Sequence, residues 1–173
     1  MAPEKIKRGK RDGISTDRRK FNMKLAEALQ ERADLNRSIM DLRSRLEQVM
    51  LVQEGMKPVE DPKALMKSLD ESIDRLEYLM AAINHSNDVT EAGGMTLTQI
   101  IAKKDALKLK LAAYKDLAGE AGSNTSRARG TEIRVLPTIK AADLQKDADR
   151  IAKEIRQLDN LLQETNWTKE LIE

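Results

Sequence analysis

The amino-acid sequence predicts an all-α protein: an antiparallel, coiled-coil-like helical bundle with four main helices. Charged residues make up 35% of the chain and aromatic residues only 2%, a mixture typical of long amphipathic helices rather than of sheets. Four segments carry apolar residues in alternating steps of three and four, the spacing of a helix face that packs on another helix. At 173 residues, the chain is long enough to bury a core in one domain.

Residues 1–22 form a basic segment, in which eight lysines and arginines stand against three acidic residues. We expect a disordered, solvated tail, as is common at chain ends. Alternatively, the arm binds nucleic acid or an anionic membrane surface through its positive charge. A third interpretation is that translation starts at Met23, because AGG codons at Arg18 and Arg19 would form a ribosome-binding sequence before it. Residues 23–173 are expected to form a single helical domain.

The first helix is predicted from about Asp17 or Met23 to about Glu54. It carries a heptad repeat with one basic interruption, formed by Leu25, Ala28, Arg32, Leu35, Ile39, Leu42, Leu46 and Val49. A helix of this length spans about 45 to 55 Å, so we expect part of it to project or to pack on another subunit. Gly55, Pro58 and Pro62 end it.

The second helix is predicted to begin at Pro62, with Asp61 as its N-cap, and to end near His85. Its apolar positions are Met66, Leu69, Ile73, Leu76, Met80 and Ile83. Residues 84–94 are polar and contain Gly93 and Gly94, which predicts a loop with a turn before the next helix.

The third helix is predicted to open with a capping box, in which Thr96 and Gln99 satisfy each other's free backbone donors. Its packing positions are Leu97, Ile100, Lys104, Leu107, Leu111, Tyr114 and Ala118. A small, polar stretch follows, and residues 132–136 before Pro137 predict a short extended segment. The last helix carries its pattern without interruption from Leu144 to Thr165, and Trp167 is expected just past its end.

Arg32 and Lys104 occupy packing positions that the heptad pattern reserves for apolar side chains. A basic residue there must extend to solvent or pair with an acid. If the first and second helices fold back about residue 58, Arg32 comes level with Asn84 and His85. If the second and third helices fold back about residue 91, Lys104 comes level with Glu77. We expect these residues to form polar layers that set helix register and partner number; a ligand pocket is the alternative.

No catalytic, cofactor-binding or metal-ligating constellation stands out in the sequence. His85 is the only histidine, and Ala82 stands where a Glu-x-x-His metal pair would need a glutamate. The chain contains no cysteine, which fits a reducing compartment. Its apolar runs are short, residues 49–52 among them, so we expect no transmembrane segment and a cytoplasmic location.

The sequence resembles an uncharacterised bacterial family often labelled septicolysin. The similarity rests on residues 23–36 and 52–55, Thr96-Leu97-Thr98 followed by residues 103–108, Glu132-Ile133-Arg134, and Asn166-Trp167. It covers residues 23–173 and omits the basic arm, which favours the start at Met23. The resemblance implies an all-helical, coiled-coil-like and oligomeric domain. The family label implies a thiol-activated pore-forming lysin, whereas this chain has no cysteine.

Three functional hypotheses follow. The first is a non-enzymatic, cytoplasmic structural or interaction protein that forms a homo-oligomer through its long first helix. The second is a membrane-active, septicolysin-like protein whose helices open and lay their apolar faces into a bilayer. The third is a nucleic-acid-associated protein that uses residues 1–22, whose binding would collapse with salt.

Overall fold

The computed structural model describes residues 23–123 and 136–172 of the chain. They form α1 (Leu25–Val49), α2 (Pro62–Val89), β1 (Glu91–Ala92), β2 (Met95–Thr96), α3 (Leu97–Ser123) and α4 (Ala141–Thr168). The predicted all-α class with four helices is confirmed. Residues 1–22 and 132–135, for which we expected a basic arm and an extended segment, lie outside the described residues.

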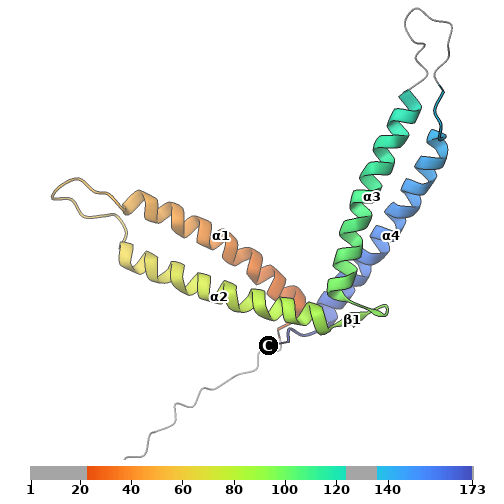
Figure 1. Cartoon of the computed structure of the whole chain (residues 1–173). Coiled ribbons are helices and arrows are strands. Elements are labelled where there is room, and N and C mark those ends of the chain that lie inside the picture. The colour runs from red at the N-terminus through yellow and green to blue at the C-terminus, as the bar shows by residue number, and fades with distance from the viewer. Residues whose placement is uncertain (1–22, 124–135, 173) are drawn as a thin grey trace, which may run out of the picture.

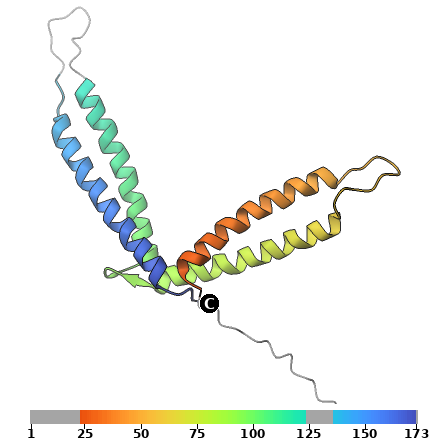
Figure 2. The same ribbon diagram turned by 180° about the vertical axis from the view of Figure 1, so that it is seen from behind.

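The four helices pack as two antiparallel pairs that diverge from a common corner, so the molecule is V-shaped (Figures 1 and 2). We call α1 with α2 the first arm and α3 with α4 the second arm. The second and third helices do not fold back on each other about residue 91, because α3 packs along α4 instead. Helices α2 and α3 approach each other only at the corner, where the antiparallel β1–β2 hairpin joins them.

Local signals in the sequence set where the helices begin. Asp61 Oδ1 accepts a hydrogen bond from the Lys63 N–H at 3.0 Å, as an N-cap does. At α3 the predicted capping box is present: the Thr96 N–H donates to Gln99 Oε1 at 3.0 Å, and the Gln99 N–H donates to Thr96 Oγ1 at 3.3 Å. Gly93 and Gly94 form the hairpin turn with φ angles of 57° and 79°, which glycine adopts without a steric penalty.

The main hydrophobic core lies at the corner and draws side chains from all four helices. Its buried members are Leu25, Ala28, Leu79, Ile83, Leu97, Ile100, Leu158 and Leu162. A second cluster, formed by Leu42, Leu46, Val49 and Leu65, closes the first arm far from the corner. The arms therefore share one core where they meet, while each arm farther out is stabilised by its own pair of helices.

The residues after α4 form backbone hydrogen bonds with the start of α1 at the corner. The Leu25 N–H donates to the Lys169 carbonyl at 3.0 Å, and the Leu171 N–H donates to the Met23 carbonyl at 2.8 Å. The next residue donates its N–H to the hydroxyl of Ser86, which is fully buried on α2. The end of the second arm is thereby tied to both helices of the first.

Helix boundaries differ from the prediction where no capping residue marks them. The first helix ends at Val49 rather than near Glu54, and the second continues past His85 to Val89. Trp167 lies within α4 rather than past its end. These positions carry no proline or N-cap pattern, so the hydrogen bonding of the folded chain sets the ends.

Candidate functional site

A pocket of about 250 Å³ lies where the two arms diverge, and we call it the corner pocket. Every helix contributes to it. The lining residues are Leu29 from α1, Asn87 from α2, Ile101 and Lys104 from α3, and Asp159, Leu162, Gln163 and Asn166 from α4. A pocket of this size is smaller than a typical cofactor site, so it suits a small ligand or a few side chains of a protein partner.

The polar wall of the corner pocket centres on an ion pair between the two helices of the second arm. Lys104 Nζ donates to Asp159 Oδ1 at 2.8 Å, and the Lys104 side chain is only 18% exposed. Three side-chain amides, those of Asn87, Gln163 and Asn166, complete the wall. Such a wall can bind polar groups of a partner, while Leu29 and Ile101 offer apolar contact.

Of the residues proposed as polar layers, only Lys104 takes part in this pocket. Lys104 pairs with an acid, as expected for a basic residue at a packing position. Its partner is Asp159 rather than a residue near Glu77. Glu77 is exposed on the first arm. The pairing was wrong because the third helix folds back on the fourth and not on the second.

Arg32 does not come level with Asn84 and His85 as expected. Its neighbour Glu31 forms an ion pair with Arg75, with Oε1 2.7 Å from Nε. Arg32 therefore lies about ten residues closer to the start of α2 than expected. The loop turns earlier than expected because α1 ends at Val49. Arg32 is half-buried and forms no ion pair within the part of the chain that the structure describes, and both Asn84 and His85 are exposed.

Within residues 23–123 and 136–172, no three His, Cys, Asp or Glu side chains come together in a way that could hold a metal ion. Among the described helices, none is both long and apolar enough to cross a bilayer.

The second helix places its apolar residues differently from the prediction. Met66, Ile73 and Met80, predicted as packing positions, are 45%, 45% and 47% exposed. Leu65 and Leu79, which directly precede Met66 and Met80, are buried instead. Helix α2 is therefore rotated by about one residue relative to the predicted face, and we call the exposed row Met66, Ile73 and Met80 the α2 stripe.

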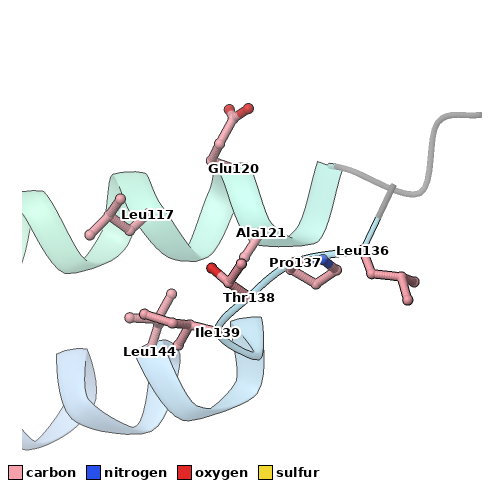
Figure 3. A pocket seen from close by; sticks show the side chains of 8 residues that line it. All are labelled: Leu117, Glu120, Ala121, Leu136, Pro137, Thr138, Ile139 and Leu144. Carbon is pink, nitrogen blue, oxygen red and sulfur yellow. The ribbon is translucent and has the colours of Figure 1, made fainter. Parts of the chain in front are cut away.

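The far ends of both arms also expose apolar side chains. In the loop between α1 and α2, Leu51 and Val59 are 90% and 96% exposed, and Met50, Val52 and Met56 accompany them. We call residues 50–59 the tip loop. At the end of the second arm, a pocket of about 280 Å³ is lined by Leu117, Glu120, Ala121, Leu136, Pro137, Thr138, Ile139 and Leu144 (Figure 3). Glu120 is the ionisable residue in this lining, so the lining offers no acid–base pair.

Over residues 32–171 the chain matches a family of unknown function, DUF6847. The chain belongs to the DUF6847 family. The match includes every lining residue of the corner pocket except Leu29. A solved structure of a functionally unknown conserved protein from Corynebacterium diphtheriae is similar, with 41% identity and a TM-score of 0.74, covering 86% of this chain and 98% of that chain. No curated protein matches.

The DUF6847 match agrees with the expectation of an uncharacterised family. Neither this family nor the Corynebacterium protein carries the septicolysin name. That resemblance therefore stays a prediction. Sequence reasoning missed Asn87, Asp159, Gln163 and Asn166, because none stands in a motif. Pairing the last two predicted helices about the polar stretch between them would have brought Lys104 opposite Asp159.

Proposed function

We propose that this chain is a non-enzymatic interaction protein that works in the cytoplasm and self-associates through its long amphipathic helices. The supporting observation is the set of large apolar side chains that stay exposed on the first arm, in the α2 stripe and the tip loop. Contiguous apolar patches on soluble proteins commonly mark sites of protein association. The lack of cysteine fits a reducing compartment.

The surface used for self-association differs from the one inferred from sequence. The heptad positions of α1, which we expected to contact another subunit, pack on α2 of the same chain. The exposed residues on α2 and in the tip loop are the better candidates. The solution mass, measured by light scattering on the full chain and on a chain starting at Met23, tests the proposal. A discrete oligomer supports it, and a monomer at all concentrations contradicts it.

A membrane-active protein, as the septicolysin resemblance implies, is the second candidate. The tip loop supports it, because an exposed apolar loop at the end of a helical arm can enter the interfacial region of a bilayer. Dye release from liposomes at micromolar protein, lost in a Leu51→Ser/Val59→Ser variant, would favour this candidate. Intact liposomes together with a discrete oligomer would favour the interaction protein.

A further inference from the structure

We infer that the α2 stripe is the contact surface of a two-fold symmetric dimer, in which the first arm of a second copy lies antiparallel along the first arm of this one. The inference rests on the proposed self-association and names its surface, partner and geometry. The two flanks of the first arm, the spacing of the stripe and the position of the tip loop each support it.

The two flanks of the first arm differ in chemistry. On one flank, ion pairs hold α1 to α2 and to the residues just before it: Glu31 pairs with Arg75 of α2, and Arg45 pairs with Glu60. On the other flank, α2 exposes Met66, Ile73 and Met80 at seven-residue intervals, a spacing that places them on one face of the helix, with Asp70 and Glu77 beside them. The charged side chains of the first flank have partners within the chain, whereas the apolar side chains of the second flank stay exposed.

The stripe is symmetric about its own centre. Met66 and Met80 stand seven residues before and after Ile73, and all three are exposed to nearly the same extent. A two-fold axis beside Ile73 brings the two Ile73 side chains together and places Met66 of each copy on Met80 of the other. A self-complementary surface of this kind is what an isologous dimer requires.

The area is sufficient for a stable dimer. Helix α2 has 28 residues and is therefore about 42 Å long, and two packed helices present a face about 20 Å wide. Contact along this face covers on the order of 800 Å² per partner, the size of a standard specific interface. Asp70 and Glu77, both exposed, lie on the outer side of the stripe, where an interface rim stays hydrated.

The same axis also gives the tip loop a place to bind. Asn87 follows Met80 of the stripe by seven residues and lines the corner pocket together with Leu29. This flank of the first arm therefore faces the second arm at the corner. Val59 and Asn87 stand on opposite sides of Ile73, each 14 residues away. The antiparallel arrangement therefore carries the apolar tip loop of each copy toward the corner pocket of the other, where Ile101 and the side-chain amides can receive it.

Single-cysteine variants test the geometry directly, because the native chain contains no cysteine. Under mild oxidation Ile73→Cys should form a disulfide-linked dimer at least about tenfold faster than Leu109→Cys, a control on α3 that is 76% exposed. Met66→Cys alone should cross-link no faster than the control, because the antiparallel arrangement separates the two copies of this position by about 21 Å. Mixing Met66→Cys with Met80→Cys should give the mixed disulfide.

A charge variant measures the contribution of the stripe. Ile73→Lys should raise the dissociation constant of the dimer at least tenfold, with an unchanged helical circular-dichroism spectrum because Ile73 lies outside the core. Leu109→Lys should leave the dimer intact. Self-linking of Met66→Cys as fast as of Ile73→Cys, or an Ile73→Cys rate equal to that of the control, would overturn the inference. If the wild-type chain is a dimer in that case, the proposed self-association stands without this surface; if it is a monomer, both fail.

Discussion

Lys104 of α3 pairs with Asp159 of α4 at a position where the heptad pattern calls for an apolar side chain, with 2.8 Å between Nζ and Oδ1. The lysine is mostly buried, whereas the aspartate is 44% exposed. The pair links the two helices of the second arm at the edge of the corner pocket. Its role in setting helix register remains a prediction.

Removing the Asp159 carboxylate should lower the free energy of unfolding more than replacing Lys104 with an apolar residue. Asp159→Ala leaves the Lys104 ammonium without its partner and should lower stability by about 1 to 2 kcal/mol. Lys104→Leu should be neutral or stabilising, because leucine fits the heptad position. Denaturant unfolding measures both. The exposed pair Lys103–Glu154, 2.7 Å apart, is the matched control. In a double-mutant cycle, the coupling free energy between its two side chains should be at most about 1 kcal/mol. Equal coupling in the two pairs would argue against a special role for Lys104.

Ser86 should stabilise the corner through the chain end that it binds. Its buried hydroxyl accepts the Ile172 N–H at 2.8 Å, so Ser86→Ala leaves that donor unpaired and should cost about 1 to 2 kcal/mol. Ser72→Ala is the control, because the Ser72 hydroxyl donates only to the Ser68 carbonyl within α2. Hydrogen exchange at the Ile172 amide should accelerate in the Ser86 variant alone. An unchanged exchange rate would contradict the role of this hydrogen bond.

Two glycine-to-alanine substitutions should act in opposite directions. At Gly93 the φ angle is positive, and an added Cβ would lie 3.1 Å from Leu161 Cδ2, so alanine should cost about 1 to 2 kcal/mol. At Gly119 an added Cβ meets nothing within 4 Å, and alanine in the helix should stabilise by about 0.5 to 1 kcal/mol. Thermal unfolding distinguishes them. Equal shifts of the two midpoints would mean that the turn is not held as described.

Stability should depend on pH through Glu60. The hydrogen bond from Arg45, which approaches with Nε 3.2 Å from Oε1, lowers the pKa of Glu60 below its ordinary value. A carboxylate with a lowered folded-state pKa stabilises the protein above its unfolded pKa, and this contribution disappears as the pH falls through the folded value. The stability difference between wild type and Glu60→Gln should therefore be present at neutral pH and shrink below about pH 4. A difference that stays constant from pH 7 to pH 3 would contradict the pairing.

The number, order and approximate limits of the helices were determined by the sequence alone. Asp61 with Pro62, and Thr96 with Gln99, marked two helix starts because capping is a local interaction between residues at most three apart. Leu144 to Thr165 marked the face of α4 for the same reason, since its three-and-four spacing needs no knowledge of the partner. The ends without caps, at Val49 and Val89, were misplaced by four or five residues.

Only the tertiary structure decided which helix covers which. Helix periodicity shows that a face is apolar but carries no information on the element that packs against it. The sequence neighbours Leu65 and Met66 are both apolar, yet only Leu65 is buried. The pairing of α3 with α4 placed Lys104 beside Asp159, and the rotation of α2 left Met66, Ile73 and Met80 exposed. The corner pocket is likewise a product of long-range packing, because its lining comes from four helices that no local pattern connects.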